Sequence, residues 1–119
     1  MIITNISRSE ILRLTQTSFG TRILLCFNSP QQVRQELGNF VNFLRDERID
    51  FTVRHHQGEI DLEGSKLMFK VVSDASVKEK LAGILVSSVI LNDVKLSTNS
   101  ILRLQHRCWR QSLKLRGIK

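Results

Sequence analysis

Proline occurs once and glycine six times among the 119 residues of this chain, so long disordered or low-complexity segments are not expected. No apolar run approaches the roughly 18 residues that a membrane-spanning helix needs. The N-terminus shows no basic region followed by a long apolar stretch, which is the pattern of a secretory signal. These absences favour a cytoplasmic protein with no membrane partner. The length and the 41% share of apolar residues suit one domain with its own core.

Cysteine is also scarce, and the two cysteines lie far apart in the sequence. Cys26 falls in the apolar run RILLCF, where we expect a buried, reduced thiol. A disulfide between Cys26 and Cys108 is the alternative. Neither CxxC nor a Cys/His pair with zinc-ligand spacing occurs. His55 and His56 are neighbours in a predicted strand and point to opposite faces, so they are poorly placed to share a metal. The sequence predicts no metal and no cofactor.

Acidic residues are absent from the last 19 positions. Residues 1–100 hold 12 Lys/Arg and 11 Asp/Glu, a net charge of +1, whereas residues 101–119 hold six Lys/Arg and no acid, a net charge of +6. The body of the chain is therefore nearly neutral, and the tail carries most of the charge. Such asymmetry indicates an anionic partner more strongly than a uniformly basic surface does.

Apolar periodicity predicts strands that alternate with helices. The predicted strands cover 1–4, 21–27, 51–56, 58–62, 66–72 and 87–94, and the predicted helices lie at 8–17, within 28–49, at 76–84 and at 97–117. This order indicates an α/β fold, a single domain over residues 1–119. We expect a mainly parallel sheet with an antiparallel hairpin added between residues 51 and 72.

Capping residues support these helices. Ser7 followed by Glu10 three positions later is a capping-box pattern. Ser29 before Pro30 predicts a helix that begins with proline as its first residue. Asp74 or Ser76 is expected to cap the helix at 76–84.

Carboxylates alternate with apolar residues in the predicted strand near residue 60. Glu59, Asp61 and Glu63 share one face, and Ile60 and Leu62 share the other. Two carboxylates spaced in this way are able to bind a divalent ion, but a solvated strand face is the favoured interpretation, because simple alternation produces the same pattern.

Two longer stretches resemble a known family. RILLCFNSPQQVRQELGNFVNFL is similar to the strand–helix unit after the phosphate loop of P-loop NTPases of the viral terminase and helicase type, and GSKLMFKVVSD with KEKLAGILVSSVILNDVK is similar to the later strands. In that family the last strand ends in two acids, and the matching residues here are Asn92 and Asp93. The opening MIITNISRSE falls where the glycine-rich loop belongs, yet it contains no glycine. The resemblance implies a degenerate, P-loop-like domain, virus-encoded and acting in the host cytoplasm, that has lost ATP hydrolysis.

Residues 97–119 form a predicted basic amphipathic helix with its extension. On a helical wheel Arg103, Arg107, Arg110 and Lys114 fall in one narrow sector, and Arg116 and Lys119 extend the charge beyond it. The opposite side carries Ile101, Leu104, Cys108 and Leu115. The helix is therefore able to dock by its apolar side and to present a row of cations. The alternative interpretation of this row is an ordinary solvated face that happens to be basic.

Three functional hypotheses follow. The first is a non-catalytic protein that binds DNA or RNA phosphates through these six cations. The second is a protein-interaction module, an inhibitor or adaptor of an NTPase or nucleic-acid machine that engages an acidic partner or a copy of itself. The third, which the sequence favours least, is a nuclease or NTPase that uses Asp93 and the carboxylates at 59–63.

Overall fold

The computed structural model describes residues 2–4, 6–17, 20–77, 86–91, 94 and 96–105. The strands are β1 (Ile2–Thr4), β2 (Arg22–Phe27), β3 (Thr52–Arg54), β4 (Glu59–Leu62), β5 (Ser65–Val71) and β6 (Ser88–Leu91), and the helices are α1 (Arg8–Thr17) and α2 (Pro30–Asp46). Residues 98–105 are also helical. These elements confirm the α/β class and reproduce most of the element boundaries expected from the sequence.

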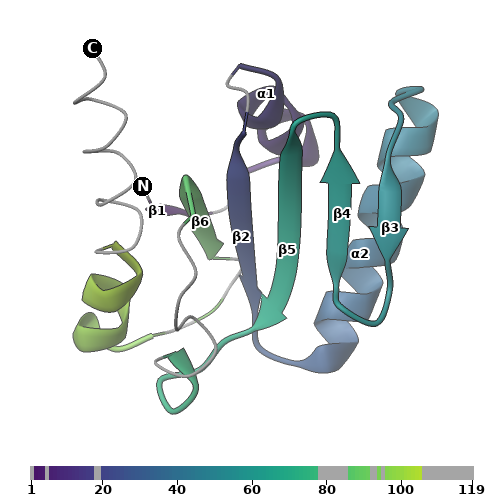
Figure 1. The fold of residues 1–119 in the computed structure, drawn as a ribbon. Helices are drawn as coiled ribbons and strands as arrows, with labels where there is room; N and C mark the ends of the chain where they lie inside the picture. Colours follow the sequence, from purple (N-terminus) through teal and green to yellow (C-terminus); the bar gives the residue numbers. More distant parts are fainter. Residues whose placement is uncertain are drawn as a thin grey trace.

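The six described strands form one mixed sheet in the order β1-β6-β2-β5-β4-β3 (Figure 1). The pairs β1–β6, β6–β2 and β2–β5 are parallel. The pairs β5–β4 and β4–β3 are antiparallel, which confirms the predicted hairpin segment. Strands distant in the sequence thus lie side by side, because β6 is inserted between β1 and β2.

The N-caps of both long helices are as expected. The Ser7 hydroxyl accepts a hydrogen bond from the Glu10 amide at 3.2 Å. The Ser29 hydroxyl accepts one from the Gln32 amide at 3.3 Å, and Pro30 begins α2. Each cap satisfies an amide that the first turn of a helix leaves without a partner.

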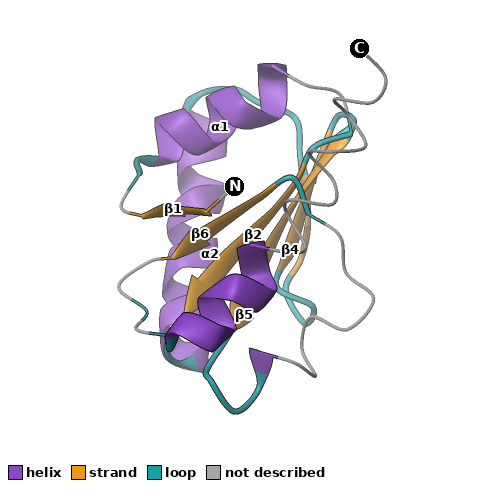
Figure 2. Ribbon diagram, turned by 90° about the vertical axis from the view of Figure 1, so that its left-hand side faces the viewer, coloured by secondary structure: helices purple, strands orange, loops and turns teal. Residues whose placement is uncertain are grey.

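Both long helices lie on the same side of the sheet (Figure 2). The apolar stripe of α2 buries Leu37, Phe40, Val41 and Leu44. Phe40 meets the ring of Phe69 from β5 edge-on at 5.8 Å, and the Phe69 ring stacks with that of Phe27 at 6.0 Å. These contacts form the first core.

A second core lies on the opposite face of β2, so this strand is buried on both sides, as its continuous apolar run predicts. The strands contribute Leu24, Cys26, Met68, Val89 and Leu91, and other segments contribute Val72, Val77, Val86, Val94 and Leu104. The predicted burial of Cys26 is confirmed at 0% exposure. Cys108 lies outside the described residues, as does most of the predicted helix at 76–84.

Candidate functional site

The basic helix begins at a defined cap. The Ser97 hydroxyl accepts a hydrogen bond from the Ser100 amide at 3.3 Å, and the Ser97 carbonyl accepts one from the Ile101 amide at 3.0 Å. Ser97 is therefore the capping residue at the start of the predicted C-terminal helix.

Asp74 also binds at this helix start. Its Oδ1 accepts hydrogen bonds from the Ser100 hydroxyl at 2.6 Å and from the Ser97 amide at 2.8 Å. The Ser100 hydroxyl, followed by the Ser97 amide, lowers the pKa of Asp74 below its ordinary value. A negative charge at a helix N-terminus is also favourable to the helix dipole. The sequence offered Asp74 or Ser76 as the cap of the helix at 76–84, most of which lies outside the described residues. The bonds of the Asp74 carboxylate that the structure does show join the loop after β5 to the basic helix.

The described part of the helix is amphipathic in the predicted sense. Leu104 is fully buried in the second core and Ser100, one turn earlier, is 4% exposed, whereas Arg103 is exposed. Arg103 makes no ion pair with any described residue. The helix thus docks through one side and leaves the arginine on the other.

Several predicted site residues lie outside the described residues. These are Arg107, Arg110, Lys114, Arg116 and Lys119 of the basic surface, together with Asn92 and Asp93. Their positions on one face stay predictions from the sequence. The strand predicted at 51–56 ends at Arg54, so His55 and His56 lie exposed in the turn between β3 and β4 rather than in a strand.

The face of the sheet over β3, β4 and β5 carries an ion-pair network that the sequence did not predict. Arg54 contacts Asp61 at 2.9 Å and Glu59 at 3.5 Å, and Lys66 contacts Glu59 at 3.4 Å and Asp61 at 3.9 Å. The carboxylates are therefore half-buried and paired rather than freely solvated. One of these ion pairs could have been predicted from the sequence. A tight turn at 63–64 places Asp61 opposite Lys66 in the β4–β5 register.

A divalent-ion site receives no support from this network. Among the described residues no group of three His, Cys, Asp or Glu side chains is arranged to hold a metal. Glu59 and Asp61 instead have two cations as partners. The favoured interpretation from the sequence, a solvated strand face, is therefore corrected for Glu59 and Asp61, which are paired and partly buried. Glu63, which was expected on the same strand face, lies exposed in the turn after β4.

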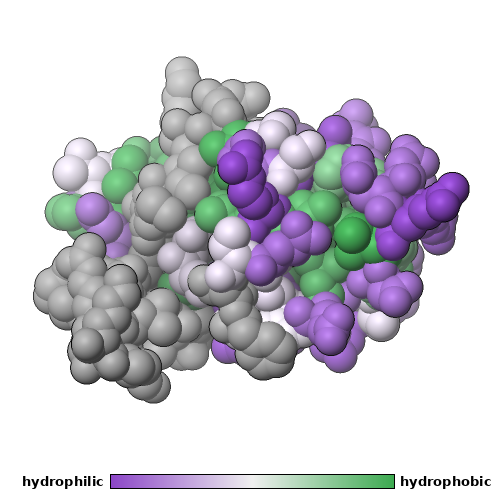
Figure 3. All heavy atoms as spheres, turned by 90° about the horizontal axis from the view of Figure 1, so that it is seen from above, coloured by the Kyte–Doolittle hydropathy of each residue, from purple (hydrophilic) through white to green (hydrophobic). Residues whose placement is uncertain are grey.

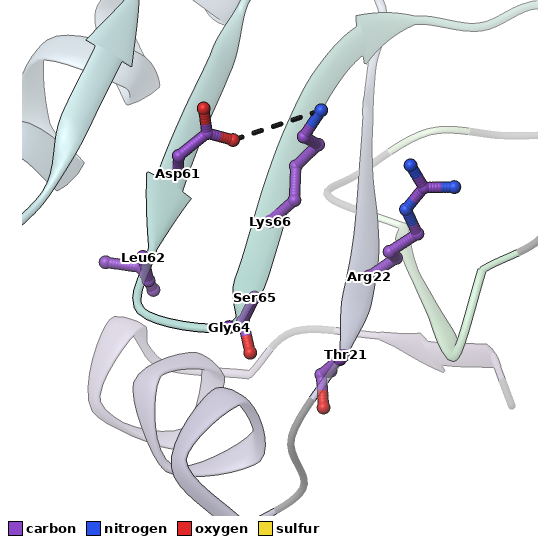
Figure 4. Close-up of a pocket in the computed structure, with 8 residues that line it drawn as sticks. Thr21, Arg22, Asp61, Leu62, Gly64, Ser65 and Lys66 are labelled. Atoms are coloured by element: carbon purple, nitrogen blue, oxygen red, sulfur yellow. Dashed lines mark ion pairs between the residues drawn. The ribbon is translucent and has the colours of Figure 1, made fainter.

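An open pocket of about 260 Å³ adjoins the network at the beginning of β2 and β5 (Figure 4). Its lining includes Arg22, Lys66, Asp61, Thr21 and Ser65. Arg22 and Lys66 are register partners in the parallel pair β2–β5, so both lie on the same face of the sheet. The Ser65 hydroxyl instead donates to the Thr15 carbonyl of α1. The pocket therefore presents two cations and one carboxylate.

The described surface offers little apolar area for docking. Seen from above, hydrophilic side chains cover most of the side that holds α2 and β3, with smaller hydrophobic areas between them (Figure 3). Leu102, which is 55% exposed, is the one large hydrophobic residue in the described part of the chain that is largely open to solvent. None of the described helices is both long and apolar enough to cross a membrane.

The fold and these contacts define an α/β protein with a mixed six-stranded sheet in its described residues and a core on each face. No family model, curated protein or solved structure matches the chain.

Proposed function

We propose that this protein binds nucleic acid through the phosphate backbone, using the basic helix that begins at residue 98, and that it catalyses no reaction. The observation that carries the proposal is the opposite exposure of two neighbours: Leu104 is buried in the second core and Arg103 is exposed. If the helical period continues, Arg107, Arg110 and Lys114 follow Arg103 on the outward side.

The charge of the segment supports the same partner. Six cations and no Asp or Glu lie between residues 101 and 119, so the segment contains no acidic side chain to neutralise them. Phosphates bound by such cations release condensed counterions, which makes affinity depend on salt. Phosphate contacts carry no base information, so binding should be insensitive to sequence.

A relationship to P-loop NTPases without ATP hydrolysis remains part of this proposal. The alternation of β1, α1, β2 and α2 with parallel pairing of β1, β6, β2 and β5 supports it. The segment between β1 and α1 contains no glycine, and Ser7 caps α1 there. Because a phosphate loop needs close backbone approach, we expect no ATP binding in a titration with a fluorescent ATP analogue and Mg²⁺.

The test is a fluorescence-anisotropy titration of labelled single- and double-stranded DNA and RNA between 50 and 300 mM salt. Four phosphate contacts predict a slope of about −3.6 for log affinity against log salt on duplex DNA, or about a hundredfold loss between 50 and 200 mM. Changing Arg103, Arg107, Arg110 and Lys114 to Gln should abolish binding.

The matched control removes the same number of charges from the body of the protein. Arg13, Arg34, Arg45 and Arg48 are all exposed, and their replacement by Gln should leave most of the affinity intact. No binding by the unchanged protein at 50 mM salt would overturn the proposal and favour an acidic protein partner. A requirement for a divalent metal would instead favour the nuclease hypothesis.

A further inference from the structure

We infer that the pocket at the beginning of β2 and β5 binds a phosphate-type oxyanion between Arg22 and Lys66. This site lies on strands rather than on the basic helix, and it does not rest on the nucleic-acid proposal. Figure 4 shows the Arg22 and Lys66 side chains on adjacent strands, with Asp61 beside Lys66.

The first argument is the strand register. Arg22 lies directly opposite Lys66, and neighbouring strands are only about 4.8 Å apart. Like charges in facing positions on two strands destabilise a sheet. A locally unfavourable arrangement of this kind is typical of a functional site, where a ligand supplies the missing interaction.

The second argument is the charge balance of the network. Arg54 and Lys66 supply two positive charges, and Glu59 and Asp61 supply two negative charges, so these four residues sum to zero. Arg22 adds one positive charge and makes no ion pair with a described residue. Only Arg22, Lys66 and Asp61 of these residues line the pocket, so the lining keeps an excess charge of +1, as does the whole cluster.

The third argument is that Lys66 is held only loosely by its partners. Asp61 lies 2.9 Å from Arg54 but 3.9 Å from Lys66, and Glu59 lies 3.4 Å from Lys66. A strong charge-assisted hydrogen bond measures about 2.8 Å. The Lys66 ammonium can therefore donate to an incoming anion while Arg54 continues to neutralise Asp61.

The chemistry of the two cations selects the ligand class. A guanidinium offers a planar fork that fits two oxygens of one phosphate, and an ammonium adds a point charge. The pocket volume of about 260 Å³ exceeds the space of a few waters and admits a tetrahedral oxyanion. A phosphate monoester is the ligand class, either as a free small molecule or as the terminal phosphate of an oligonucleotide.

In the first experiment the full chain is titrated with inorganic phosphate at constant ionic strength. Binding is measured by calorimetry and by the phosphorus NMR signal. Arg22→Gln should lower the phosphate affinity about tenfold or more, since it removes a charge-assisted contact. Arg22→Lys should retain part of it. Lys70→Gln is the matched control, because Lys70 lies on the same face of β5 but outside the pocket lining.

A second experiment distinguishes a free phosphate ester from the terminal phosphate of an oligonucleotide. It compares the binding of a nucleoside monophosphate with that of short oligonucleotides that carry or lack a 5′-phosphate. Preference for the 5′-phosphorylated strand over its 5′-hydroxyl form assigns a nucleic-acid end, and equal binding of the two strands alongside monophosphate binding assigns a free ester. The fourfold variant of the basic helix should keep its phosphate affinity. Absence of phosphate binding at millimolar concentration, or equal loss in Arg22→Gln and Lys70→Gln, overturns the inference.

Discussion

Gly58 occupies a backbone position that other residues enter only with strain. Its φ is +64°, and a Cβ built there would lie 2.6 Å from the Phe69 carbonyl oxygen. The Gly58 carbonyl in turn accepts a hydrogen bond from the Phe69 amide at 2.7 Å. The turn between β3 and β4 is thus fitted against β5 through this residue, which keeps the ion-pair network in register.

Gly58→Ala should therefore lower the free energy of unfolding by about 1–3 kcal/mol, since both the positive φ and the contact oppose a side chain. Gly38→Ala is the matched control. Gly38 lies inside α2 with nothing within 4 Å of its Cβ position, and the change should stabilise the protein by up to about 1 kcal/mol. Urea denaturation measures both effects, and equal responses of the two variants would contradict this account of Gly58.

The hydrogen bonds of Asp74 should make the stability of the start of the basic helix depend on pH. Its folded-state pKa lies below the ordinary value of 3.8 because of hydrogen bonds from the Ser100 hydroxyl and then the Ser97 amide. A carboxylate with a depressed pKa contributes stability that is present above its unfolded-state pKa and is lost as pH falls through its folded-state pKa. The helix start should therefore loosen only in acid, below pH about 4.

Hydrogen-exchange protection of the Ser100 and Ile101 amides, corrected for intrinsic rates, measures this effect. Protection should fall as the pH is lowered below about 4 in the unchanged protein, and Asp74→Ala should show reduced protection throughout with no such fall. Asp50→Ala changes an exposed loop carboxylate and should retain the original profile. An identical pH profile in Asp74→Ala and the unchanged protein would exclude Asp74 as the cause.

The two long helices are joined by one ion pair between their polar sides. Arg8 of α1 donates to both carboxylate oxygens of Glu36 in α2, at 2.7 and 2.9 Å. The hydrogen bond to Glu36 raises the pKa of Arg8. A two-point contact of this kind restricts orientation as well as distance.

A double-mutant cycle with Arg8→Gln and Glu36→Gln should give a coupling energy of about 0.5–1 kcal/mol. The value is modest because the two side chains are 40% and 20% exposed and water screens the charges. The exposed Arg13–Glu10 pair within α1 is the comparison, and its coupling should be only about 0.3 kcal/mol. A larger coupling for the exposed pair would contradict the role of the Arg8–Glu36 contact.

The sequence predicts the elements well where the signal is local. Ser7 and Ser29 mark helix starts that the structure confirms, and the run RILLCF becomes a strand buried on both faces. These features depend on residues within a few positions of one another, which is why capping and periodicity reveal them.

Pairings between distant segments were not accessible in the same way. Nothing local indicates that β6 is inserted between β1 and β2, or that Arg22 lies opposite Lys66. Asp74 illustrates the same limit, because its carboxylate binds serines more than 20 positions later in the chain. The predicted sides of Arg103 and Leu104 are confirmed because helical spacing alone assigns them.

In the whole molecule, the second core connects the basic segment to the rest of the protein. It draws on β2, β5, β6 and the residues that follow them, and Leu104 is its contribution from the basic helix. Removing this side chain leaves every cation in place but detaches the helix from its support. The consequences for stability and for binding can therefore be separated.

Leu104→Ala should lower the free energy of unfolding by about 2–4 kcal/mol, since it removes a fully buried side chain and leaves a cavity. Nucleic-acid affinity should fall several-fold, because the helix must then be ordered on binding. The salt slope should not change, since the number of phosphate contacts is set by cations that remain. Leu102→Ala is the matched control, because Leu102 is 55% exposed and its loss should alter stability by no more than about 0.5 kcal/mol. Urea denaturation and the salt titration together check the prediction, and a shallower slope in Leu104→Ala would show that the second core also positions the cations on the phosphates.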